Sequence, residues 1–428
     1  MNRDVVWTKG HKLKRFDIIP TSRGGDFLNM MGQLNSLKYY EDVIDPSIHV
    51  EIVCVDTHGF YNQLPIRSGS PVRVEITHPS QEKPLKFDLG SGYDPLVITN
   101  ISNHVADNKR EAYVLTLETK AAINNHITRV WEKKTGSITS TVKNILSSKL
   151  QVPGNKMMGK NFDTTKNSSE FYGNYRRPFK VISDLCPKSI PSSVDGDSPS
   201  SGSGGFLFFE TQDGWNFRST DKLFASDPVE KYLMTTYKTG MDPKNNFMLA
   251  SQPVWKESHD ILKKLRSGAY KTANWYYDVL TRKVLFSEYS YDKAQKHQKK
   301  ANKEVVLPTD YKDSYSRIIL GTIDKGTTTT DVSGSGAAKP QDQATYQAQS
   351  NSRYSSVFAQ TLNITVPMNL SLRAGNMLEL EFPDLNNPRG KNAQSGKYMI
   401  ARLAHEFGNP QGDFTGLTLV RDTFQKNK

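Results

Sequence analysis

Side chains that could do chemistry are few in this sequence, and they do not converge. Its nine histidines are scattered, and none has metal-ligand spacing to a second histidine or a cysteine. His405-Glu406 lacks the later histidine of a zinc-protease motif. Asp56 and His58 lie close together, but no Gly-x-Ser-x-Gly motif is present to supply a nucleophile. We therefore interpret His58 as a turn residue.

Two further patterns have simpler structural interpretations. Residues 202–205 (GSGG) lack the Lys-Ser/Thr end of a phosphate-binding loop and precede a strand, so they are interpreted as linker. Glu210 and Asp221 are the carboxylates that could pair for acid–base hydrolysis, but the sequence leaves their separation open. Ordinary surface acids are the preferred interpretation. The sequence thus predicts no catalytic, cofactor-binding or metal site, and no enzymatic activity.

Cysteines and aromatic clusters also favour structure over catalysis. Cys54 and Cys186 cannot build a disulfide scaffold or a four-cysteine zinc site, so each is expected to be a small buried residue. The run Trp275-Tyr276-Tyr277 could stack on a sugar or a base. Its alternation within a hairpin instead favours packing of one face against a core.

The charge balance allows a nucleic-acid partner but does not demand one. Among 428 residues, 56 Lys and Arg oppose 44 Asp and Glu, giving a net charge of +12 that is not gathered into a single stripe. The densest run, residues 293–303, has no aromatic side chain for base stacking, so it favours a solvated loop or an acidic protein partner. No secretory leader or long apolar span is visible. We expect a soluble protein made in a reducing compartment, without membrane insertion.

The hydrophobic pattern changes twice along the chain. Residues 1–119 alternate with period two, as in 72–76, and predict an antiparallel sheet or barrel. Period 3.6 then predicts helices over 123–131, ended by Gly136, over 138–150, and over 178–185, followed by a flexible stretch at 192–205. A hairpin around Asp213-Gly214 spans 206–219. Further on, the pattern predicts a helix at 261–265, a hairpin at 275–286, long exposed loops over 293–352, including 326–340, and strands at 360–366, 377–382, 398–405 and 415–421.

An internal repeat relates the two ends of the chain. Residues 66–76 align with 372–382, and seven of these eleven positions are identical or similar in kind. Ile98 and Leu115 are separated by 17 residues, as are their counterparts Ile400 and Leu417. Gly69 and Gly375 each precede an alternating strand, where a positive φ would form the turn. A chance match between amphipathic strands is the alternative, but the equal spacing favours two copies of one small β domain.

The fold class predicted is mainly β with α+β insertions: two similar antiparallel β-barrel-like tube domains in one chain, plus inserted helical and mixed domains. The expected division is a first β tube domain at 1–119, a helical or mixed insertion at 120–205, a discontinuous second tube domain at 206–239 and 353–425, and an inserted α+β region with long polar loops at 240–352.

This ordered set of segments resembles the baseplate hub protein of T-even-like contractile-tailed bacteriophages, a family related to the hub part of type VI secretion spike proteins. The resemblance covers most of the chain outside roughly 293–350, and no single motif is diagnostic. The matching segments are 39–45 (YYEDVID) with 50–56 (VEIVCVD), 177–179 (RPF), 205–211 (GFLFFET) with 213–219 (DGWNFRS), and 372–375 (LRAG) with 398–405 (YMIARLAH). The long polar stretch at 293–352 departs from the pattern.

The resemblance implies a non-enzymatic structural hub of the tail baseplate. Three chains with two similar domains each would form a ring of pseudo-sixfold symmetry, with DNA only in transit through its bore. Implied partners are the chain itself as a homotrimer, the central spike protein and tail-tube or tube-initiator proteins, with tape-measure and baseplate wedge proteins as further candidates. The implied location is the virion, after assembly in the host cytoplasm. Two alternatives stay open: a basic β-barrel nucleic-acid-binding module and a tail-associated cell-wall hydrolase.

Overall fold

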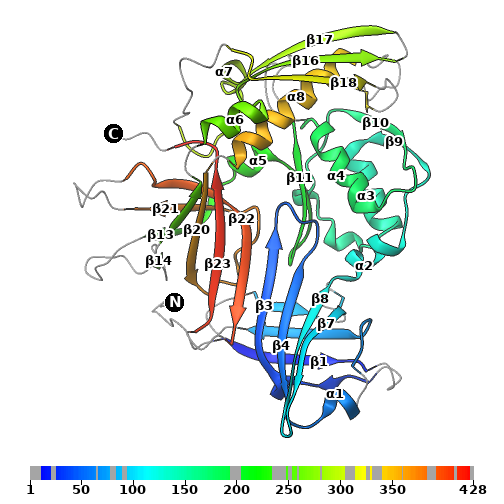
Figure 1. Cartoon of the computed structure of the whole chain (residues 1–428), viewed down its shortest axis with the longest axis vertical. Helices are drawn as coiled ribbons and strands as arrows, with labels where there is room; N and C mark the ends of the chain where they lie inside the picture. Colours follow the sequence, from blue (N-terminus) through cyan, green and yellow to red (C-terminus); the bar gives the residue numbers. More distant parts are fainter. Residues whose placement is uncertain are drawn as a thin grey trace.

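Strands dominate the computed structural model, and helices cluster at one side and at one end (Figure 1). The structure describes residues 11–20, 26–63, 66–77, 83–88, 94–192, 204–233, 247–248, 253–257, 260–279, 282–303, 314–323, 328–329, 340–358, 360–382, 392–408 and 412–424. The predicted fold class, mainly β with helical insertions, is confirmed. Most of the predicted linker at 192–205 and of the predicted loop at 326–340 lies outside the described residues.

The N-terminal half contributes one run of neighbouring strands, in the order β2-β1-β5-β7-β8-β4-β3. Side chains in these strands alternate between buried and partly exposed, as the period-two pattern predicts. Strand β6 (Leu85–Phe87) pairs with β5, and the short elements η1 (Met31–Gln33) and α1 (Phe60–Gln63) lie between strands. The bounds are β1 Lys12–Ile18, β2 Leu28–Asn29, β3 Leu34–Asp42, β4 His49–Asp56, β5 Pro71–Thr77, β7 Leu96–Ala106 and β8 Glu111–Glu118.

The C-terminal half repeats this order strand for strand, as β14-β13-β21-β22-β23-β20-β15. One position differs in direction, because β13 runs parallel to β21 whereas β1 runs antiparallel to β5. The two halves join where β3 pairs with β22, so 15 strands form one sheet (Figure 1). The bounds are β13 Pro228–Leu233, β14 Phe247–Met248, β15 Val254–Glu257, β20 Gln360–Pro367, β21 Met377–Glu381, β22 Gly396–Phe407 and β23 Phe414–Arg421.

The internal repeat is confirmed at the level of single hydrogen bonds. The N–H of Gly69 donates to the carbonyl of Ile98, and that of Gly375 to the carbonyl of Ile400, each at 2.8 Å. Both glycines have positive φ, +94° and +82°. Beyond Ile98 and Ile400, both β7 and β22 carry a bulge at the next residue against their partner strands. A shared bulge at equivalent positions is hard to explain by chance alternation.

One hydrophobic core runs through both halves of the sheet. Ile52 and Leu117 contribute from one half, and Leu362 and Leu419 from the other. Cys54 belongs to this core, and Cys186 belongs to a second core in the helical insertion described below. The prediction that both cysteines are buried is confirmed.

The predicted helical insertion forms a second core beside the sheet. Helices α3 and α4 match the prediction, but the first predicted helix is wrong at its end: α2 stops at Ile127, and Trp131 lies on an exposed connection. Gly136, the expected helix end, lies in a strand at φ +120°. The bounds are α2 Lys120–Ile127, β9 Lys133–Ser137, α3 Ile138–Ser148, η2 Gly154–Lys156, η3 Gly159–Asn161, β10 Ser168–Tyr172, α4 Pro178–Leu185 and η4 Cys186–Lys188.

The predicted hairpin at 206–219 is confirmed as β11 (Phe206–Thr211) and β12 (Gly214–Ser219), which form a two-stranded sheet of their own. Both its faces are buried, which explains the unbroken apolar run at 206–209. Phe206, Phe208, Trp215 and Phe217 pack into the helical core, whereas Phe209 packs against the C-terminal half of the main sheet. The hairpin thus packs between the helical core and the C-terminal half of the main sheet.

A third small sheet, β17-β16-β18, lies at one end of the molecule with α8 across one face, in addition to β11-β12 and β19-β10-β9 (Figure 1). The prediction of long exposed loops over 293–352 is wrong for the described residues, because β18 and α8 fall there. Helix α8 was missed since its buried side chains include polar ones, Gln349, Ser352 and Arg353. The remaining bounds are α5 Thr220–Ala225, α6 Ile261–Ser267, β16 Lys271–Asp278, β17 Lys283–Ser290, α7 Tyr291–Ala294, β18 Arg317–Ile323, β19 Thr328–Thr329 and α8 Pro340–Val357.

The two repeat glycines give a matched test of the fold. Alanine at Gly69 has no atom within 4 Å of its new Cβ, so Gly69→Ala should cost only the left-handed backbone strain, about 1–2 kcal/mol. Alanine at Gly375 would meet the Phe209 ring at 2.8 Å and should cost about 1–3 kcal/mol more. Urea unfolding of both variants checks this, and equal losses would contradict the different packing of the two turns.

Candidate assembly interface

The two carboxylates considered for hydrolysis lie in separate buried networks. Glu210 Oε2 accepts hydrogen bonds from the N–H of Ile48 at 3.3 Å and the hydroxyl of Thr119 at 3.0 Å. Asp221 Oδ1 forms an ion pair with Arg353 at 3.1 Å. Both acids are buried, which corrects their interpretation as surface residues. Each therefore joins segments of the fold, and the structure does not bring the two together in a cleft.

His58, the other singled-out residue, lies just beyond β4. Its N–H donates to Asp56 Oδ1 at 2.9 Å, which is the geometry of an Asx turn and confirms the turn interpretation. Among the described residues, no group of three or more His, Cys, Asp and Glu side chains could hold a metal ion. In the same part of the chain, no helix has the length and apolar content needed to cross a membrane.

A buried charge cluster that the sequence did not reveal holds the junction of the two halves. Glu41 of β3 is fully buried and accepts hydrogen bonds from the Tyr39 hydroxyl at 2.7 Å, the N–H of Gln212 at 2.9 Å and the N–H of Ala374 at 2.8 Å. Arg373 Nε lies 4.0 Å from the same carboxylate. One side chain thus links β3, the β11–β12 turn and the loop before β21.

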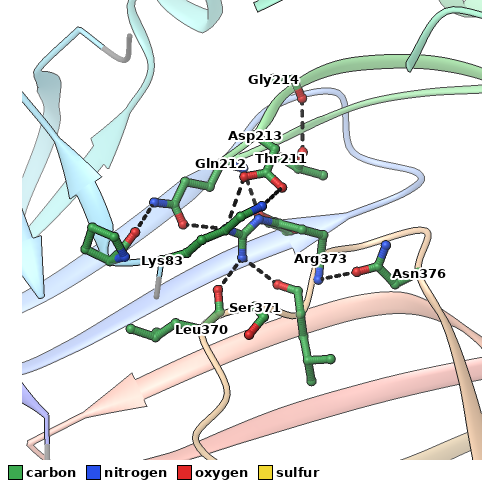
Figure 2. Close-up of polar contacts among 12 residues, drawn as sticks. Lys83, Thr211, Gln212, Asp213, Gly214, Leu370, Ser371, Arg373 and Asn376 are labelled. Atoms are coloured by element: carbon green, nitrogen blue, oxygen red, sulfur yellow. Dashed lines mark hydrogen bonds and ion pairs between the residues drawn. The ribbon is translucent and has the colours of Figure 1, made fainter. Parts of the chain in front are cut away.

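Arg373 completes this cluster through four further hydrogen bonds (Figure 2). Its Nη1 donates to the carbonyls of Leu370 at 2.6 Å and Leu372 at 2.7 Å. Its Nη2 donates to Gln212 Oε1 at 3.0 Å and Asp213 Oδ1 at 3.3 Å. A planar guanidinium with fixed donors suits such a multi-carbonyl site, whereas a lysine could not satisfy all four acceptors.

The same hairpin turn is also tied to the N-terminal half. Gln212 Nε2 donates to the carbonyl of Pro84 at 2.6 Å, and Lys83 Nζ lies 3.5 Å from Asp213 Oδ2 (Figure 2). The turn therefore contacts both halves through two adjacent residues, and fixes their relative orientation. The sequence predicted the hairpin, but the contacts by which its turn links the two halves involve segments far away in the sequence.

Burial sets the protonation of these groups. Burial raises the pKa of Glu41, although Arg373 acts to lower it. Burial raises the pKa of Glu210 to about 8, against the opposing effect of its hydrogen bonds to Ile48 and Thr119. Burial disfavours the charged form of Arg373, but Glu41 and Asp213 outweigh it and raise the pKa. Burial thus shifts both acids toward their neutral forms, while Glu41 and Asp213 favour the charged form of Arg373.

Two strand edges that correspond to the β22·β3 junction lack a partner strand among the described residues. In the C-terminal half, β3 covers the edge of β22 over residues 402–407. The equivalent edge of β7, beyond Val97, has no partner strand in the described part of the chain. The same is true, within those residues, of the edge of β15 that faces away from β20, although β15 occupies the position of β3. The open edges of β7 and β15 therefore correspond to the two strands of the β22·β3 junction, but they are not paired with each other in the described structure.

The repeat assigns equivalent residues at these edges. Lys38 of β3 lies opposite Glu406 of β22, and their side chains form an ion pair at 3.5 Å. Strand pairing with β8 and β23 makes Val105 the counterpart of Glu406, and pairing with β4 and β20 makes Val254 the counterpart of Lys38. Both valines are exposed, at 67% and 57%. Val105 and Val254 are therefore exposed and apolar at the two repeat positions where Glu406 and Lys38 form an ion pair.

An exposed apolar face is present on the third sheet. Trp275, Phe286 and Leu320 lie side by side across β16, β17 and β18, on the face opposite buried Tyr276. The prediction that the aromatic run packs one face against a core holds for Tyr276, while Trp275 and Tyr277 face solvent. Adjacent exposed apolar side chains of this kind make the face a candidate contact surface.

This architecture defines a class: a chain whose two repeated β halves share one sheet. No family model matches the sequence, and no curated protein matches it. Solved structures do share its fold. A tail protein from Neisseria meningitidis MC58 aligns with TM-score 0.57 and 11% identity over 96% of this chain and 97% of its own. The 43 kDa tail protein of prophage MuSo2 from Shewanella oneidensis aligns with TM-score 0.53 and 9% identity over 96% and 99%. At such identities the likeness establishes the fold, and that fold is the one implied by the predicted resemblance.

The repeat provides a matched test of the buried cluster. Arg373→Met leaves Glu41 buried without its counter-ion and should cost about 3–5 kcal/mol. Arg67→Met changes the same repeat position in the other half, where the side chain is exposed, and should stay within about 0.5 kcal/mol. Denaturant unfolding measures both, and a similar loss at the two positions would show that the cluster does not stabilise the junction.

Glu210 should make stability fall with rising pH. Its folded pKa of about 8 exceeds the ordinary value of about 4.3, so between these values the folded chain holds a proton that the unfolded chain has released. Unfolding free energy should then drop by at most about 1.4 kcal/mol per pH unit across this window. Glu210→Gln keeps the acceptor oxygen and removes the titration, so its stability relative to the parent should rise from pH 5 to 8. A difference that is constant with pH in thermal melts would contradict this assignment.

Proposed function

We propose that this chain is a non-enzymatic structural component of a phage tail, acting as the hub of its baseplate. Three copies form a ring of pseudo-sixfold symmetry that joins the tail tube to the central spike and lets DNA pass through its bore. The proposal is supported by two strand-for-strand equivalent halves in one chain and by the shared fold with two tail proteins.

The observation that carries the proposal is the closed β22·β3 junction beside two corresponding edges, for which the described residues supply no partner strand. Strand β3 covers β22 within the chain, and β15 and β7 are the equivalent strands with open edges. If β15 of one copy covers β7 of the next as β3 covers β22, three copies give six near-equal junctions, three within chains and three between them. Such a head-to-tail contact must close into a ring or extend into a filament.

Open edges favour this closure energetically. Unpaired backbone N–H and C=O groups on an edge strand are a template for pairing with another chain, so a stable protein must cover them. In the proposed register Val254 of one copy faces Val105 of its neighbour. An apolar pair suits a contact that is buried only after assembly, because no charge has to lose its water. We expect each interface to bury more than about 2,000 Å² in total.

The ring implies partners of two symmetries. Its sixfold-like side suits tail-tube or tube-initiator proteins, and its threefold side suits a central spike. Tape-measure and baseplate wedge proteins are further candidates, and assembly in the host cytoplasm precedes incorporation into the virion. Residues 1–119 carry 13 Lys and Arg against 15 Asp and Glu, a net charge of −2. This charge favours DNA transit over a basic nucleic-acid-binding barrel.

Cysteine cross-linking tests both the ring and its register. The double variant Val105→Cys/Val254→Cys should give a covalent trimer on oxidation, because facing residues of antiparallel strands come within disulfide reach. Each single variant should stay monomeric on a non-reducing gel, since Cys54 and Cys186 are buried. A particle that light scattering shows to be trimeric but that does not cross-link would refute the register alone. A stable monomer in the presence of the spike protein would refute the hub.

A further inference from the structure

Positive charge is concentrated in one segment of the chain. Residues 120–192, from α2 to just past η4, carry 13 Lys and Arg against four Asp and Glu, a net charge of +9 out of +12 for the whole protein. The first β half next to it carries −2. A charge excess on one segment is unnecessary for folding, and it attracts a partner of opposite charge.

The same segment exposes large aromatic side chains on one ribbon. Strands β9 and β10 pair Lys133 with Tyr172, and the pairing continues to a hydrogen bond from the N–H of Val130 to the carbonyl of Arg176 at 2.9 Å. Trp131, Tyr172 and Tyr175, on or beside this ribbon, are 56%, 62% and 73% exposed. Tryptophan and tyrosine are the residues that most often carry binding energy at protein interfaces.

A pocket of about 400 Å³ opens beside these aromatics. Phe171, Val181 and Leu185 give it apolar walls. Cations and two acids complete the lining, together with Tyr172 and Asn174: Lys133, Arg176, Lys188, Glu170 and Asp184. The pocket is therefore suited to a side chain that is apolar in its body and lies next to negative charge.

The pocket cations are held by ion pairs that a partner can exchange. Lys133 pairs with Glu170, and Arg176 Nη1 lies 2.8 Å from Asp184 Oδ2. The side chains of both pairs are about one-third to one-half exposed. Exposed pairs of this kind contribute about 0–1 kcal/mol, so replacing their carboxylates by those of a partner costs little.

A protein segment fits this surface better than a nucleic acid does. Glu132, Glu170 and Asp184 lie among the lysines and arginines, and a continuous row of phosphates would meet these carboxylates. A peptide can place its acids opposite the cations and an apolar residue in the pocket.

We infer that the surface formed by Trp131, Tyr172, Tyr175 and the adjoining pocket docks an acidic segment of a protein partner. The segment inserts one apolar side chain between Phe171, Val181 and Leu185 and sets its carboxylates against the surrounding cations. This surface lies outside the open edges of β7 and β15, so the inference holds whether or not the chain forms a ring.

Fluorescence anisotropy with the full chain tests the docking surface. The probe is a labelled peptide of about twelve residues, rich in Asp and Glu, with a central Leu-Phe pair. It should bind at about 0.15 M salt, and both Lys133→Glu and Tyr172→Ser should weaken it about tenfold or more. Lys109→Glu makes the same charge change on the exposed β7–β8 turn and should alter binding less than twofold. Circular dichroism melts confirm that the variants are folded.

Two further probes separate this surface from general charge attraction. A matched peptide with Gly-Gly in place of Leu-Phe should bind about tenfold more weakly, because it cannot fill the pocket. A 20-base-pair DNA duplex should bind weakly and show no dependence on Tyr172. Equal binding of the two peptides, equal loss with Lys109→Glu, or tighter Tyr172-dependent binding of the duplex would each overturn the inference.

Discussion

Backbone pairing between β3 and β22 is the interaction on which the rest of the molecule depends. It turns two seven-stranded runs into one continuous sheet and lets a single core extend through both. The pairing brings Glu41 to the start of β21, where Arg373 and the β11–β12 turn complete its hydrogen bonds. A buried carboxylate is costly unless fully partnered, so the cluster penalises any other arrangement of the halves.

Duplication explains what the halves share, and contact explains how they differ. Both copies keep the glycine turn and the bulge after the repeated isoleucine, since these depend on backbone conformation that each copy needs for itself. Arg67 and Arg373 hold the same repeat position, yet only Arg373 is buried, and its guanidinium donates to Gln212 and Asp213 of the β11–β12 turn. Likewise Lys38 and Glu406 pair across a junction formed within the chain, while their counterparts are two valines at open edges.

Local patterns in the sequence predicted what depends on local forces. Period-two alternation, the hairpin at 206–219, Pro178 at a helix start and the repeat spacing all correspond to observed elements, although the turn of the hairpin is Gln212-Asp213, one residue before the predicted Asp213-Gly214. Helix α8 could not be predicted from hydrophobic periodicity, because its buried side chains include the polar Arg353, Gln349 and Ser352. Tertiary hydrogen bonds and ion pairs hold such side chains in the interior. The buried role of Glu210 was missed for the same reason: its partners lie 91 and 162 residues away. Charge counted by segment, in place of runs, would have revealed the basic region at 120–192.

The order of segments along the chain bears on how the molecule is made. Strands β1 to β8 are complete by Glu118, whereas the second half takes strands from both sides of the β16–β18 sheet and lacks β23 until residue 421 has been synthesised. During translation the outer edge of β3 therefore stays unpaired until β22, which begins 354 residues after β3 ends (Asp42 to Gly396), has been synthesised. Neighbouring nascent chains would offer the same two strands, so this connectivity leaves a route by which unfinished chains can pair with one another in place of folding alone.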